Sequence, residues 1–199
     1  MRENLNVARR PAIDALGGIA ALAAGAAVSL CAPACAEPTP PGYSVKAVFL
    51  TKFPPFVQWP DAAFDSQAGP FNICVLGADP FGPALDQAVS GQHAGQHPLA
   101  VKRLSRADRS SGCQILYLGG AKGPAAADAL AALKGAPVLT VSEESRHDVD
   151  GCVLTFALRD NRVRFSIDAQ AARQGGLTIS SKLLSLAISV RPVIPAEAR

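Results

Sequence analysis

The sequence predicts an α/β fold: a sandwich in which a mostly parallel central sheet carries a C-terminal β-hairpin and helices cover both faces. Short apolar runs alternate with segments of helical periodicity along the chain. Two of these runs, Phe71–Leu76 and residues 113–118, are almost continuously apolar, as is typical of strands buried on both faces. Near the C-terminus, two further runs flank Asp160 and Asn161, a pair that favours a tight hairpin turn.

The first helix is expected directly after Ser44, which can cap its N-terminus. Helical spacing predicts one buried apolar face on this helix, formed by Val45, Val48, Phe49 and Phe53. Lys46 and Lys52 should lie elsewhere on this helix, and the Pro54-Pro55 pair should end it. An apolar segment at residues 56–60, which we call the hook, follows directly.

The later elements are expected from periodicity and from capping and turn residues. Asp79 and Pro80 favour the start of a helix that runs to about residue 89. Asp168 can cap a short helix that Gly175 and Gly176 terminate. The remaining elements, in chain order, are a strand at 99–104, a helix at 125–134, strands at 138–141, 153–158 and 163–167, and a final helix at 181–189.

The first 36 residues are expected to be an export signal and not part of the fold. Three arginines precede an apolar, Ala/Gly-rich run, and Ala34-Cys35-Ala36 offers the small residues that signal peptidase reads. A retained membrane anchor is the alternative, but the run is short and weakly hydrophobic for a span. The expected organisation is a signal peptide at 1–36, an extended lead-in at 37–42, one domain at 43–191 and a flexible tail at 192–199.

Composition and motif spacing argue against several functional classes. The net charge is +3 and aromatic residues make up 6% of the chain, which disfavours a dedicated nucleic-acid binder. The cysteines and histidines show no CxxC or HExxH spacing, and glycines and a proline around the one HxxxH pair, His93 and His97, argue against a helix that would aim both at one ion. We therefore expect no metal site and no cofactor. We also expect no catalytic site, because Ser142, His147 and Asp148 lack the turn of a serine hydrolase. His93 and His97 are expected in a solvated loop.

Two groups of residues suggest sites of other kinds. Arg162 and Arg164 lie on one face of an expected strand and can grip a carboxylate or phosphate, or pair with neighbouring carboxylates. Ser181 and Lys182, at the start of the last helix, can bind an anion through backbone N–H groups, or simply form an ordinary cap. Together the four residues suggest a periplasmic protein that binds a small anion or nucleotide.

Three cysteines follow the expected cleavage site. In an oxidising compartment two of them should pair. Cys74 and Cys113 lie on expected strands, and adjacent strands can bring their Cα atoms within about 5.5 Å. Cys152 is then expected to be a small buried residue.

Four segments in this order resemble the YfiR family of exported bacterial proteins, over about residues 43–190. They read VKAVFL with FVQWP at 45–60, ICVLGADPFG at 73–82, NRVRFSID at 161–168 and GLTISSKLLSLA at 176–187. The sequence departs from the family in lacking a second cysteine pair near Cys152 and in the prolines that interrupt the first helix.

The resemblance implies a function in regulation and not in catalysis. It implies a periplasmic repressor that binds the periplasmic sensor domain of an inner-membrane diguanylate cyclase and lowers cyclic-di-GMP and biofilm formation. It also implies a homodimer, a sequestering partner at the outer membrane, and the Cys74–Cys113 pair. A repressor of this kind needs apolar anchors for its partner. The candidates near the first helix, which can equally be core residues, are Phe49, Phe53, Phe56 and Trp59.

Overall fold

The computed structural model describes residues 41–121, 123–144 and 151–193. The expected export signal, residues 37–40 of the lead-in and residues 194–199 of the tail lie outside the described residues. Pro41 and Gly42, which we expected in the extended lead-in, form the start of the first helix.

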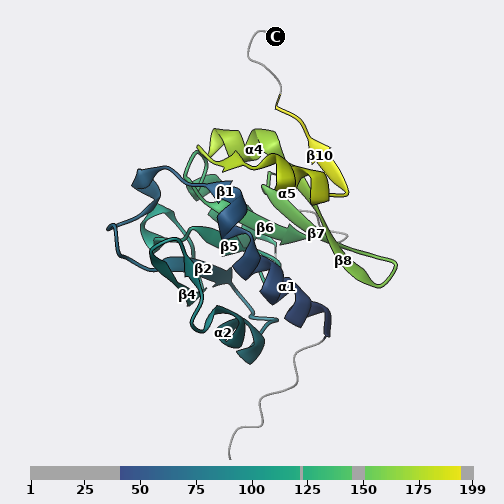
Figure 1. The fold of residues 1–199 in the computed structure, drawn as a ribbon, viewed down its shortest axis with the longest axis horizontal. Coiled ribbons are helices and arrows are strands. Elements are labelled where there is room, and N and C mark those ends of the chain that lie inside the picture. Colours follow the sequence, from purple (N-terminus) through teal and green to yellow (C-terminus); the bar gives the residue numbers. More distant parts are fainter. Residues whose placement is uncertain (1–40, 122, 145–150, 194–199) are drawn as a thin grey trace, which may run out of the picture. The chain divides into compact units, whose positions relative to one another are not determined.

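Within the described residues, eight strands form one sheet, and the expected mostly parallel α/β architecture is confirmed (Figure 1). The strand order is β10-β8-β7-β6-β5-β2-β4-β3, in which the β3–β4 and β7–β8 pairs are antiparallel and the other pairs are parallel. The strands are β2 (Phe71–Leu76), β3 (His93–Ala94), β4 (His97–Leu104), β5 (Ile115–Tyr117), β6 (Leu139–Glu143), β7 (Leu154–Arg159), β8 (Arg162–Asp168) and β10 (Ser189–Arg191). A separate antiparallel pair joins β1 (Val57–Gln58) to β9 (Thr178–Ile179).

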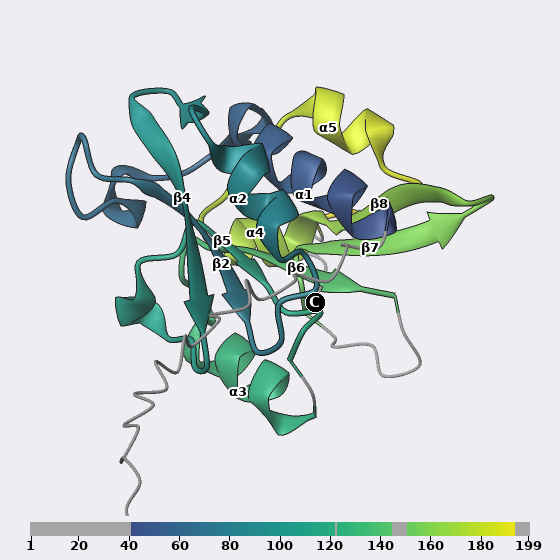
Figure 2. The same cartoon turned by 90° about the horizontal axis from the view of Figure 1, so that it is seen from below.

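Helices cover both faces of this sheet, as expected (Figure 2). Four helices share a core with one face: α1 (Pro41–Lys52), α2 (Pro83–Val89), α4 (Ala169–Gln174) and α5 (Ser181–Leu186). Helix α3 (Pro124–Ala132) packs on the opposite face in a second core. Strand β2 is buried along its whole length because its alternate side chains enter the two cores.

The predicted hairpin between β7 and β8 is confirmed. Asp160 and Asn161 connect the two strands with φ angles of 48° and 58°. Two-residue turns with positive φ at both central residues have a backbone twist that matches the twist of the flanking strands. The predicted cap of α4 is confirmed as well, because the Asp168 carboxylate accepts a hydrogen bond from the Ala171 N–H at 2.9 Å.

The expected buried face of α1 is wrong for its two valines, whereas Phe53 is buried and Phe49 packs against the core as expected. Val45 and Val48 are 46% and 50% exposed, whereas Ala47 and Leu50 are fully buried. The 12-residue helix carries apolar side chains on every side, so helical periodicity alone cannot identify the side that packs. Lys46, expected away from the core, lies on the packed side with an exposed side-chain fraction of 13%.

Two other helix boundaries differ from expectation. Helix α2 begins at Pro83 and not at Pro80, because the chain turns through Gly82 at a φ of 50°. The Asp79 carboxylate instead accepts a hydrogen bond from the Phe81 N–H at 2.8 Å. Helix α5 ends at Leu186 because the following residues form β10, an additional strand beside β8 that the sequence did not predict.

The buried side of α1 can be tested by paired truncations. Leu50→Ala should lower the free energy of unfolding by about 2–5 kcal/mol, because it opens a cavity in the core. Val48→Ala, at an exposed position of the same helix, should change it by less than about 0.5 kcal/mol. Urea unfolding of the two variants measures both values. Equal losses, or a larger loss for Val48→Ala, would contradict the observed orientation of α1.

Candidate functional site

The four aromatic candidates lie near one another but differ in burial. Phe53 is 2% exposed, and its ring centroid lies 5.6 Å from that of Phe165 and 6.1 Å from that of Phe156. It is therefore a core residue, and a partner at the surface of this conformation cannot use it as an anchor. Phe49 and Phe56 are partly buried and pack against the same core.

Trp59 holds the hook against the N-terminal ends of the central strands β2 and β5. Its ring packs edge-on against Phe71 with centroids 5.0 Å apart, and its Nε1–H donates a hydrogen bond to the Gln114 carbonyl at 3.3 Å. The hook also pairs with β9, and the Ser180 N–H donates to the Phe56 carbonyl at 2.9 Å. The start of α5 is thereby joined to the hook.

A cavity of about 290 Å³ opens beside the hook and is lined mainly by apolar and aromatic side chains. Pro55, Trp59, Phe64 and Ala94 contribute to its wall, as does His97. The imidazole of His97 stacks on the Phe64 ring at 4.1 Å, and its Nδ1 lies 2.7 Å from the Gly69 carbonyl oxygen, to which it donates. The expectation of a solvated loop is therefore wrong for His97, which belongs to β4. The cavity has the size and lining to accept an apolar side chain of a partner.

The four anion-binding candidates do not come together. Arg162 and Arg164 are exposed on the face of β8 opposite to Phe165, which packs into the core beneath α1. Ser181 and Lys182 belong to α5, on the α1 side of the sheet. Ser180 and not Ser181 caps this helix, because its hydroxyl accepts a hydrogen bond from the Leu183 N–H. No single anion can therefore contact both pairs.

Of the serine-histidine-aspartate group considered above, His147 and Asp148 lie outside the described residues. The Ser142 hydroxyl lies 3.0 Å from that of Thr155 on the adjacent strand. In the described part of the chain, no group of three metal-ligating residues is close enough to hold an ion. The helices among these residues are too short or too polar to cross a membrane.

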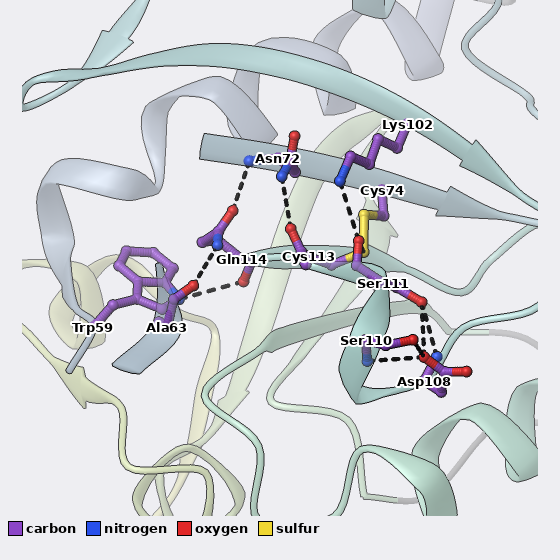
Figure 3. The surroundings of a disulfide bond; sticks show 11 residues. Trp59, Ala63, Asn72, Cys74, Lys102, Asp108, Ser110, Ser111, Cys113 and Gln114 are labelled. Carbon is purple, nitrogen blue, oxygen red and sulfur yellow. Dashed lines mark hydrogen bonds between the residues drawn. A yellow bond between two sulfur atoms is a disulfide. The ribbon is translucent and has the colours of Figure 1, made fainter. Parts of the chain in front are cut away.

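The expected Cys74–Cys113 disulfide is confirmed (Figure 3). It joins β2 to the residues that lead into β5, with Cα atoms 5.9 Å apart and a sequence separation of 39. Cys152 is buried and lies outside this disulfide.

Hydrogen bonds extend the constraint of the disulfide to the hook (Figure 3). The Asn72 N–H donates to Gln114 Oε1 at 2.7 Å, and Asn72 Nδ2 donates to the Gly112 carbonyl at 2.7 Å. Gln114 in turn donates from Nε2 to the Ala63 carbonyl at 2.5 Å. The residues on either side of Cys113 thus connect β2 to the segment that follows Trp59, so the cross-link and the hook form one rigid unit.

Sequence reasoning missed a second polar feature, a cluster beneath the N-terminal half of α1. Lys46 Nζ donates to Glu143 Oε1 at 2.7 Å, and the hydroxyls of Tyr43 and Tyr117 also donate to the Glu143 carboxylate. The Lys46 ammonium lies 4.3 Å from the centre of the Tyr43 ring. About 100 residues separate the two halves of the cluster in sequence, so no local motif reveals it.

Burial controls the chemistry of this cluster. Tyr117 is fully buried, and its desolvation together with its hydrogen bond to Glu143 raises its pKa far above the ordinary value for tyrosine. Desolvation, followed by the charge of Glu143, also raises the pKa of Tyr43. Both tyrosines therefore stay protonated and act as donors. The cluster holds α1 over the carboxyl ends of β5 and β6.

The disulfide can be tested by counting thiols. The chain without residues 1–36, unfolded without reductant, should show one reactive thiol, that of Cys152, because the other two cysteines are cross-linked. Cys74→Ala/Cys113→Ala should lose about 4 kcal/mol of unfolding free energy in the loop-entropy model. Three reactive thiols in protein purified from the periplasm would contradict the pairing.

The polar cluster can be tested by a double-mutant cycle in urea. Glu143→Gln should cost about 3 kcal/mol, because the largely buried Lys46 ammonium loses its counter-charge. Lys46→Met is the second single variant of the cycle. Lys46→Met/Glu143→Gln should cost less than the sum of the two single losses, and less than Glu143→Gln alone, since both charges are gone and an acceptor remains for Tyr117. Glu144→Gln, which breaks the exposed pair with Arg159, is the control and should have a much smaller effect. Additive losses would show that the two groups do not interact.

Comparison with known proteins gives a match at the level of the family. No sequence among the curated proteins matches the chain. A family model described as YfiR/HmsC-like matches residues 43–188, which include every element from Tyr43 of α1 to the end of α5. The chain therefore belongs to the YfiR/HmsC-like family.

Proposed function

We propose that the protein is a periplasmic regulator that represses an inner-membrane diguanylate cyclase. In this proposal it binds the periplasmic sensor domain of the cyclase, which lowers cyclic-di-GMP and biofilm formation. The observation that carries the proposal is the family match over residues 43–188. The export signal expected at residues 1–36 and the Cys74–Cys113 disulfide support the same compartment, because disulfides persist in the periplasm.

The proposed mode of action is protein–protein contact and not catalysis. The region of α1 and the hook offers partly exposed aromatic rings at Phe49, Phe56 and Trp59, of which Trp59 also lines the 290 Å³ cavity. Buried aromatic anchors that enter such cavities dominate the affinity of many interfaces. The disulfide and the hydrogen bonds around it hold the hook against β2. In an interface of this kind, a rigid surface reduces the entropy that binding costs.

Two further partners belong to the proposal. A protein associated with the outer membrane would sequester the repressor and release the cyclase. A second copy of the chain would form a homodimer. Both partners are proposed from the family resemblance, and both would bind through surface contacts alone.

Deletion of the gene in its native host should raise cellular cyclic-di-GMP and surface attachment. The full-length chain supplied in trans should restore the low level. The same chain without residues 1–36, retained in the cytosol, should not, because it never meets a periplasmic sensor domain. Mass spectrometry of nucleotide extracts measures cyclic-di-GMP directly. An unchanged level in a strain that carries an intact cyclase would reject the proposal.

A further inference from the structure

The largest apolar side chains that the described residues leave exposed all lie on one side of the sheet. They are Val45, Val48, Leu158, Leu186, Ile188 and Val190, with exposed fractions between 38% and 60%. We call them, together with Lys52 and Lys182, the α1–α5 surface. Exposed apolar groups scattered over a protein are ordinary, but a concentration on one side indicates an interaction site.

Strand register places the sheet residues of this group on the α1 side. Leu158 follows Phe156 by two positions on β7, so the two side chains share a face. Val190 pairs with Ile167, and Ile188 precedes it by two positions. Phe156 and Ile167 belong to the core beneath α1, so Leu158, Ile188 and Val190 extend the same face beyond the area that the helices cover.

The helical members of the group point away from this core. Ala47 and Leu50 of α1 are buried, and Val45 and Val48 are on its outer side. On α5, Leu183 is buried and Leu186 is 58% exposed. Figures 1 and 2 both show α5 beside α1, with the β7–β8 hairpin extending past the start of α1.

The charged side chains of α1 and α5 have one sign. Helices α1 and α5 contain three lysines and no Asp or Glu. Lys46 pairs with Glu143 underneath α1. Lys52 and Lys182 are exposed, and the described residues place no carboxylate within ion-pair distance of either. Lys182 Nζ lies 5.7 Å from the centre of the Phe56 ring, so a positive charge borders the apolar groups.

We propose that the α1–α5 surface docks a protein surface that is apolar at its centre and carries carboxylates at its rim. This inference rests on the proposed function, in which the partner is the periplasmic sensor domain of the cyclase. Charge complementarity selects the partner, because carboxylates opposite Lys52 and Lys182 would be paired on binding. A second copy fits less well, because a two-fold interface through this surface brings together Lys52 and Lys182 of both copies, and α1 and α5 contain no carboxylate to pair with them. A lipid bilayer also fits less well, because anchoring there uses clusters of basic residues and interfacial aromatic rings.

The test uses the full chain in the deletion strain. Val48→Glu/Leu186→Glu replaces two apolar contacts with charges that repel an acidic partner. Lys52→Glu/Lys182→Glu reverses the positive charges and leaves every apolar side chain in place. The matched controls are Ala127→Glu/Ala131→Glu and Lys134→Glu, at exposed positions of α3 and just after it. Thermal unfolding of the purified variants confirms that each one folds.

Both variants of the α1–α5 surface should leave cyclic-di-GMP at the level of the deletion strain, whereas the control variants should restore repression. If the deletion raises cyclic-di-GMP and both surface variants still repress as the wild type does, this inference is wrong and the proposed function stands. If the deletion has no effect, the proposed function fails and this inference fails with it.

Two measurements on the purified mature chain identify the other possible occupants. Sedimentation velocity that shows a wild-type dimer and a monomeric Val48→Glu/Leu186→Glu variant would assign this surface to self-association. Co-sedimentation of the wild type, but not of this variant, with phosphatidylglycerol vesicles would assign it to the membrane. Either result would overturn the acidic protein partner. An unchanged oligomeric state and no vesicle binding are expected.

Discussion

The packing of α1 on the sheet, with the ion pair between Lys46 and Glu143 beneath the helix, decides which of its side chains reach the surface. A helix with apolar residues on every side can pack in several orientations. In the orientation observed, Lys46 reaches a carboxylate at the end of β6 that two tyrosines already hold in place. Ala47, Leu50 and the neighbouring Phe53 then enter the core, and Val45 and Val48 are left outside. One orientation of the helix therefore accounts for both its buried side and its apolar exterior.

The Cys74–Cys113 disulfide constrains the hook, which follows α1 in the chain. It cross-links β2 to the approach to β5, and the amides of Asn72 and Gln114 extend the connection to the hook. Trp59 closes the network by donating to the Gln114 carbonyl. In the proposed mode of action, these bonds would keep the binding surface in a constant shape. Loss of the cross-link would loosen the hook before it disturbed the β7–β8 hairpin, which lies elsewhere in the sheet.

Local signals in the sequence were sufficient for much of the fold. The buried strand at 71–76, the Asp160-Asn161 turn and the Asp168 cap each depend on neighbouring residues, and all three are confirmed. The short strands β1, β9 and β10 exist only because distant segments pair, so they carry no periodicity of their own. The aromatic candidates were found, but Phe53 proved to be core, since composition cannot separate an anchor from a packed ring. The Glu143 cluster joins residues about 100 positions apart, which no spacing rule detects.

The exposed surface of α1, the packing beneath it and the proposed docking all depend on the orientation of this helix. Cysteine labelling measures that orientation directly. Val48→Cys and Ala47→Cys place a thiol on adjacent positions, one half exposed and one fully buried. In the native mature chain, a maleimide should label the first variant rapidly and the second only after unfolding, with the wild type as the background for buried Cys152. Rapid labelling at position 47 with protection at position 48 would mean that α1 packs through its other side, and the account would be wrong.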